Sequence, residues 1–166
     1  MGATLQFIWL AVRAVFCLFR FRAPAAGTPF SRDLKLSENF WLSEFISPND
    51  PEGWAYCRAN WHWLEQELRF VCREILEPAR AHFGGLPVVI TSALRSWIHN
   101  KRIGGATLSQ HPKGRAVDFN IPGVPFAALH AYLGTLPKVG GLAWGPGFIH
   151  ADSRPRLFGQ IVRWTY

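Results

Sequence analysis

The sequence predicts an α+β domain in which a small antiparallel sheet is flanked by helices. One observation is a long run of apolar residues at helical spacing, namely Leu64, Leu68, Val71, Ile75 and Ala79. A second is a pair of short alternating runs, residues 115–120 and 148–152, which is the pattern of strands with one buried face. A third is Gly145-Pro146-Gly147 between two apolar runs, which indicates a hairpin.

The first 28 residues differ in character from the rest of the chain. Residues 5–21 are strongly apolar, and their polar members Gln6, Arg13 and Arg20 are seven residues apart, so on a helix they share one face. This pattern favours a helix on a membrane surface; a spanning helix and a helix packed on the domain are the alternatives. We therefore expect an apolar, membrane-associating helix and linker over 1–28 and a globular domain over 29–166.

The main helix is the longest element expected in the globular part. We expect this helix to start at Trp54 or Asn60 and to end near Phe83, before Gly84-Gly85. Pro78 should kink it or end it early, because proline lacks the amide hydrogen that an inner helical turn uses. Glu65 falls off the apolar face and is expected in solvent.

Shorter elements follow the main helix. Residues 87–91 form an apolar run typical of a central strand, and Ser96 can cap a short helix through Arg102 on which His99 points outward. Pro125 suits the first position of a helix over 126–132. The tail predicts one more strand near 160–164.

Composition narrows the class of protein. The chain has 166 residues, a hydrophobic fraction of 49% and a formal net charge of +7. This length favours one domain, and the positive charge suits an anionic partner. The sequence holds no zinc knuckle or RNA-binding motif, which makes nucleic acid an unlikely partner. Its three cysteines, Cys17, Cys57 and Cys72, do not form a disulfide framework and are expected as plain buried thiols.

Two imidazoles and a carboxylate stand out as candidate metal ligands. His111 precedes Gly114 in a loop broken by Pro112, and Asp118 lies on the first alternating run. His150 lies on the second run, and Asp152 shares its face. Two histidines and one carboxylate are a common protein ligand set for a catalytic zinc ion, which keeps a fourth position open for water.

These residues carry a resemblance to a known family. The motif Ser109-x-His-x-x-Gly-x-Ala-x-Asp118, followed by Phe148-Ile-His-x-Asp152, resembles the zinc D-Ala-D-Ala carboxypeptidase family of murein peptidases. The segment Ile90-Thr-Ser-Ala-Leu-Arg95-Ser resembles the branch of short murein endopeptidases and phage endolysins. The resemblance covers roughly residues 40–154 and implies the fold shared by the hedgehog signalling domain and the DD-peptidases.

The resemblance also implies roles for individual residues. His111, Asp118 and His150 would hold Zn²⁺, and Arg95 would clamp a substrate carboxylate or the developing oxyanion, unless it forms only a surface salt bridge. Many members of the family place an acid three residues before the last ligand, where this chain has Gly147. Asp152 is then a candidate general base, and its rival role is to orient a ligand imidazole.

The function expected from this resemblance is zinc-dependent hydrolysis of peptide bonds in bacterial peptidoglycan, for wall remodelling or for phage lysis. Stem peptides would be its substrates, and residues 5–21 would provide contact with a membrane surface. We expect a membrane-associated protein of the periplasm or cell envelope, or a phage protein released at lysis. One alternative is an inactive zinc-containing module that binds cell wall or protein, and another is a basic, membrane-bound interaction protein without metal.

Overall fold

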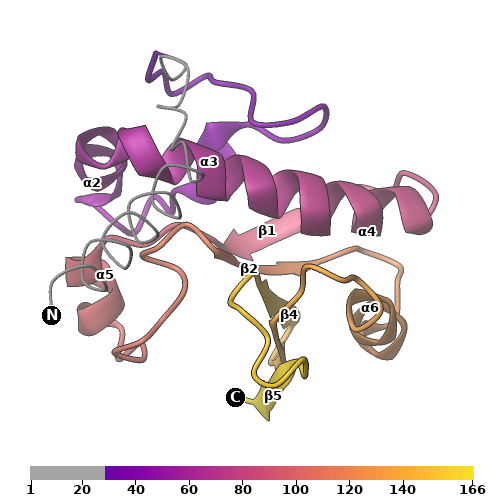
Figure 1. Cartoon of the computed structure of the whole chain (residues 1–166). Helices are drawn as coiled ribbons and strands as arrows, with labels where there is room; N and C mark the ends of the chain where they lie inside the picture. Colours follow the sequence, from indigo (N-terminus) through magenta and orange to yellow (C-terminus); the bar gives the residue numbers. More distant parts are fainter. Residues whose placement is uncertain (1–28) are drawn as a thin grey trace, which may run out of the picture.

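The computed structural model describes residues 29–166, which form a five-stranded sheet covered by helices (Figure 1). The strands are β1 (Val89–Ser92), β2 (Ala116–Asn120), β3 (Gly141–Gly145), β4 (Phe148–Asp152) and β5 (Val162–Thr165). Their order across the sheet is β1-β2-β4-β3-β5. All neighbours are antiparallel except β3 and β5, which are parallel. The predicted α+β class with its small, mainly antiparallel sheet is confirmed.

The helices fall into one long layer and several short pieces. The long layer comprises α2 (Gly53–Ala59), α3 (Trp61–Val71), the π-helical turn η2 (Cys72–Leu76) and α4 (Glu77–His82). The short pieces are the 3-10 turn η1 (Leu42–Phe45), α5 (Trp97–Arg102) and α6 (Phe126–Leu133). Figure 1 shows α3 and α4 in line across the sheet, with α6 beside α4 and α5 towards the opposite end.

The main helix keeps its predicted buried face, and its start and end lie within one residue of those predicted, but it does not end early at Pro78. Asn60 separates α2 from α3, and the helical rod then continues past Pro78 to His82. Pro78 stands in the first turn of α4, directly after the π-helical turn, in which the amide of Glu77 donates to the carbonyl of Cys72. This wider turn changes the hydrogen-bond register just where proline has no amide hydrogen to offer, so the rod is not broken.

The core lies between this rod and one face of the sheet. The five apolar helix residues predicted to be buried are each at most 1% exposed. Opposite them, β2 and β4 contribute Val117, Phe119, Ile149 and Ala151, all fully buried. The expectation for Glu65 is wrong: it is only 8% exposed, and its carboxylate pairs with Arg69 at 3.0 Å, one turn along the helix.

Pairing of β2 with β4 fixes which side chains meet on the other face. Asp118 stands directly opposite His150, and Ala116 stands opposite Asp152. Because side chains alternate along a strand, a shift by one residue would send these polar groups into the core. Burial of the apolar residues of β2 and β4 therefore fixes the strand register that places Asp118, His150 and Asp152 on the other face.

The tail adds β5 as predicted, displaced by two residues at its start and by one at its end. Its parallel pairing with β3 sets Trp164 beside Ala143, and Ala143 is in turn opposite His150. The end of β5 thus reaches the same face of the sheet as the polar cluster.

The membrane-associating helix at 5–21, the linker up to residue 28 and Cys17 lie outside the described residues. Within residues 29–166, no helix is both long and apolar enough to cross a membrane. Cys57 and Cys72 are free, buried thiols as predicted, and burial raises the pKa of each to about 12.

Candidate active site

Three separate segments bring the predicted metal ligands together. His111 lies in the loop between α5 and β2, Asp118 lies on β2, and His150 lies on β4. All three are at most 3% exposed, and one potential ligand atom from each lies within 4.8 Å of the others. The convergence predicted from the sequence is therefore present in the fold.

The His111 loop is held against α3 and against β1's end. Gly114 adopts a φ of +66°, and a Cβ there would come within 2.9 Å of the Leu64 side chain, so a larger residue would push the loop away. The Nδ1 atom of His111 lies 2.6 Å from the carbonyl oxygen of Ala93, to which it donates its hydrogen. Nε2 is then left as the unprotonated nitrogen, and it points at Asp118 Oδ2, 3.4 Å away.

His150 is fixed between two carboxylates. Its Nδ1 lies 2.7 Å from Asp118 Oδ1, and its Nε2 lies 3.0 Å from Asp152 Oδ2. With Nε2–H donated to Asp152, the lone pair that can bind a metal belongs to Nδ1, on the side of His111 and Asp118. A carboxylate that fixes the tautomer of a ligand imidazole in this way is a recurring feature of metal sites.

Asp152 is saturated with hydrogen bonds. It is fully buried, and besides His150 it accepts bonds from the backbone amide of Arg154 at 3.0 Å and from Nε of the same residue at 2.8 Å. Nη2 of Arg154 adds a further bond to Oδ2. Gly141 makes room for this carboxylate, because a Cβ there would lie 2.3 Å from Oδ2.

The electrostatics of the cluster follow from burial and these contacts. Burial lowers the pKa of His111 and keeps its imidazole neutral. Burial would also lower the pKa of His150, but hydrogen bonds to Asp118 and Asp152 raise it above its usual value. Burial opposes ionisation of Asp118, yet its contacts with His111 and His150 hold its pKa well below the usual range. The cluster thus presents a carboxylate and a neutral imidazole, with a proton on His150 that a cation would displace.

This donor set fits zinc. Nε2 of His111 is buried with no hydrogen-bond partner, which is costly unless something else binds it. Its distance of 3.4 Å from Asp118 Oδ2 matches the edge of a tetrahedron, about 3.3 Å, built on zinc–ligand bonds of about 2.0–2.1 Å. Two imidazoles and one carboxylate leave a fourth position free, as in catalytic rather than structural zinc sites.

Arg95 lies at the edge of the cluster. Its Nη2 is 2.8 Å from Asp118 Oδ2, and its Nε donates to Ser92 Oγ at 2.8 Å. The pair with Asp118 is nearly buried, so the salt bridge considered as an alternative role does exist, although it is not on the surface. Arg95 also lines the adjoining pocket, which keeps its guanidinium within reach of a ligand.

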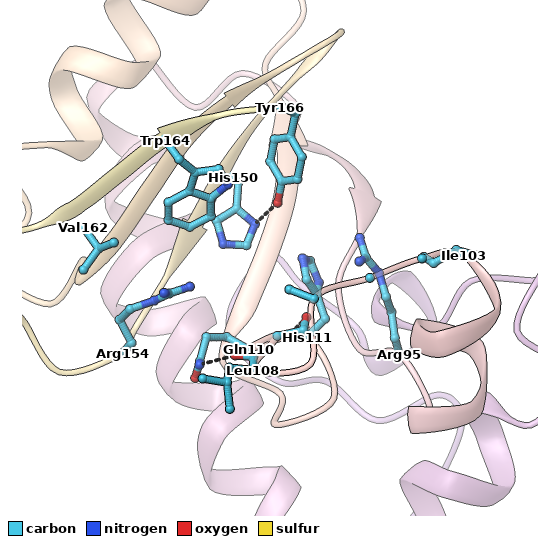
Figure 2. Close-up of a pocket in the computed structure, with 14 residues that line it drawn as sticks. Arg95, Ile103, Leu108, Gln110, His111, His150, Arg154, Val162, Trp164 and Tyr166 are labelled. Atoms are coloured by element: carbon cyan, nitrogen blue, oxygen red, sulfur yellow. Dashed lines mark hydrogen bonds between the residues drawn. The ribbon is translucent and has the colours of Figure 1, made fainter.

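A pocket of about 570 Å³ opens beside the cluster (Figure 2). Its walls come from Arg95, from the loop that carries His111 and from the end of the chain. Arg154, Trp164 and Tyr166 belong to this wall and were not picked out from the sequence. The one available signal was spacing, since Trp164 and Tyr166 are two residues apart near a predicted strand and would share a face.

Two residues outside the ligand cluster, His99 and Gly147, also bear on the sequence predictions. The expectation for His99 is wrong: its side chain does not point outward, and the residue is only 8% exposed. Gly147 occupies the hairpin turn with a φ of +86°, and a Cβ there would meet nothing within 4 Å. Residue 147, where many members of the resembled family have an acid, therefore lies in a hairpin turn with open space around it.

The comparison with known proteins agrees with the geometry. The family model described as Peptidase M15 matches residues 59–152, which is more than half of the chain and includes all three candidate ligands. A search of curated proteins finds no match. The matched range and the convergent His111, Asp118 and His150 lead to one conclusion: the chain belongs to the peptidase M15 family.

Proposed function

We propose that this protein is a zinc-dependent peptidase that hydrolyses peptide bonds of bacterial peptidoglycan. The observation that carries the proposal is the convergence of His111 Nε2, Asp118 and His150 Nδ1 with both tautomers fixed from behind. When bound, zinc polarises a carbonyl group and lowers the pKa of water towards about 7, which is the chemistry that amide hydrolysis requires.

The remaining groups have supporting roles in this proposal. Asp152 orients His150, because its oxygens already accept bonds from His150 and Arg154 and it has no exposed surface. This arrangement favours orientation over the rival role of general base. Arg95 secures Asp118 and presents a cation to an oxygen of the substrate from the wall of the pocket.

The charge of the pocket supports a peptide with free carboxylates. Arg95 and Arg154 lie on its wall, and none of the residues that line it is acidic. The chain as a whole carries a formal charge of +7. Stem peptides of peptidoglycan present such carboxylates, so attraction to them would help both encounter and orientation.

Digestion of purified peptidoglycan tests this function. We expect the zinc-loaded protein to release peptide fragments that mass spectrometry can identify, and the fragments will show whether it acts as a carboxypeptidase or an endopeptidase. Chelation should stop release, and His111→Ala should be inactive. Lack of metal-dependent cleavage on any wall preparation would contradict the proposal.

An inactive zinc-containing binding module is the second candidate. It is favoured by the glycine at position 147 and by the engagement of Asp152 with Arg154. This candidate predicts one zinc ion per chain and co-sedimentation with peptidoglycan, but no released fragments.

We further propose that residues 5–21 hold the protein at a membrane surface of the cell envelope. The apolar run with Arg13 and Arg20 on one helical face supports this location. Flotation with anionic lipid vesicles tests it: the full chain should float, and a variant with Phe16→Asp and Phe19→Asp should not.

A further inference from the structure

Tyr166 brings a hydroxyl group to the candidate metal ligands. Its Oη atom lies 3.4 Å from Nδ1 of His150, the nitrogen that would bind the metal (Figure 2). The residue follows β5, and its backbone amide donates to the carbonyl of Trp144 at 3.1 Å. Its ring also packs edge-on against Phe148, with centroids 5.5 Å apart. Backbone pairing and ring packing together direct the hydroxyl to this point.

The two arginines and Gln110 on the wall of this pocket each already donate a hydrogen bond to a partner. Arg95 is bonded to Asp118 and Ser92, Arg154 is bonded to Asp152, and Nε2 of Gln110 donates to a backbone carbonyl. The two histidines are the candidate ligands. The Tyr166 hydroxyl differs from these groups because it lies next to a candidate ligand nitrogen, Nδ1 of His150.

This contact has a consequence for the metal-bound protein. In the metal-free protein, Nδ1 of His150 carries the proton that it donates to Asp118. In the metal-bound protein its lone pair would be used by the metal, so this nitrogen accepts a hydrogen bond from the hydroxyl in neither state. The O–H of Tyr166 is therefore available to donate a hydrogen bond on the pocket side of the ligands, where a substrate oxygen would enter. Tyr166 is 64% exposed overall, so a peptide can reach it without displacing the core.

We propose that Tyr166 is a catalytic residue whose O–H donates a hydrogen bond to the carbonyl oxygen of the scissile peptide bond. That oxygen gains negative charge as the carbonyl carbon is attacked, so the bond strengthens in the transition state. The proton stays on the tyrosine oxygen throughout. The role rests on the proposed peptidase function and supplies a donor beside the metal in a site where residue 147 is glycine.

Tyr166→Phe in the full-length protein tests the proposal, because it removes the hydroxyl and keeps the ring contact with Phe148. We expect kcat to fall about 10²-fold, the scale for loss of one oxyanion donor, with KM within about threefold of the original. Zinc affinity, measured by competition with a chromophoric chelator, should change less than about twofold because no ligand is removed. A tetrahedral phosphinate analogue of the cleaved peptide should bind at least about tenfold more weakly.

Tyr132→Phe is the matched control. Its hydroxyl bonds to the carbonyl of Pro78, on the far side of the sheet from the pocket, so loss of this hydroxyl should leave kcat unchanged.

Two results with an active wild-type protein would overturn the role of Tyr166. One is a kcat for Tyr166→Phe within about twofold of the original. The other is a fall in zinc affinity that matches the fall in kcat, which would show that the hydroxyl only positions His150. A wild-type protein that binds zinc and cleaves nothing would overturn the proposed function, and the catalytic role of Tyr166 with it.

Discussion

Replacement of Asp152 by alanine should weaken zinc binding without removing a ligand. The substitution deletes the acceptor that holds His150 Nε2 at 3.0 Å, so the imidazole loses its fixed tautomer and orientation. Loss of such a supporting carboxylate typically costs 10–100-fold in metal affinity, which is about 1.4–2.7 kcal/mol. We expect zinc affinity to fall by this amount and kcat to fall with it.

The same substitution should also destabilise the metal-free protein. Asp152 is fully buried and pairs with Arg154, and breaking a buried pair costs about 3–5 kcal/mol. The side chain of Arg154 is 26% exposed, so its guanidinium can turn to water, and we expect the lower end of this range. Urea unfolding of chelator-treated protein gives this quantity separately from metal binding.

Two variants make the result interpretable. Asp152→Asn keeps an oxygen that can accept from His150, so its zinc affinity should fall less than about tenfold. Glu52→Ala removes the carboxylate of an exposed pair with Arg102, away from the ligands, and should change neither zinc affinity nor activity. Zinc affinity is measured by chelator competition and kcat by fragment release. If Asp152→Ala binds zinc as tightly as wild type but has lost turnover, the orienting role is refuted and Asp152 is the general base.

Three further outcomes follow from the structure. Zinc affinity should fall about tenfold for each pH unit below the raised pKa of His150, because a proton then occupies Nδ1 and zinc must displace it; calorimetry at several pH values checks this, and a pH-independent affinity would contradict it. Gly141→Ala should destabilise the fold by about 1–3 kcal/mol and weaken zinc binding, because the new Cβ would lie 2.3 Å from Asp152 Oδ2; an unchanged urea midpoint would count against this. Glu77→Ala should cost about 1–3 kcal/mol, because its carboxylate accepts bonds from the amide and side chain of Asn39. Burial would raise the pKa of Glu77, but these and other hydrogen bonds lower it below its usual value. The stabilisation that Glu77 provides is therefore fully present above about pH 4.3 and is lost as the pH falls through the lowered pKa of the folded state. Equal stability of wild type and variant at pH 7 would refute this prediction.

The metal cluster could be predicted because its residues sit in strong local patterns. The alternating runs around Asp118 and His150 determine which side chains share a face, and the apolar residues between them leave only one face for the core. The buried face of α3 and α4 could also be predicted, because apolar residues three or four positions apart lie on one side of a helix.

What sequence patterns missed depends on contacts between distant segments. Glu65 is buried because Arg69 accompanies it, and the helix passes Pro78 because a π turn absorbs the missing bond. Trp164 and Tyr166 reach the pocket because β5 joins β3 in parallel, and no local pattern specifies that partner. The bonds from Arg154 to Asp152 likewise depend on how the chain turns after β4.

The turn at Pro146-Gly147 limits how this site can change. Proline fixes the first turn residue, and the second has a φ of +86°, a conformation that residues with a side chain rarely adopt. A single Gly147→Glu exchange would therefore strain the hairpin and send its carboxylate towards solvent. Placing an acid beside the candidate ligands would therefore require a longer turn. The same backbone conformation opposes the appearance of such an acid at residue 147 by a single mutation during evolution.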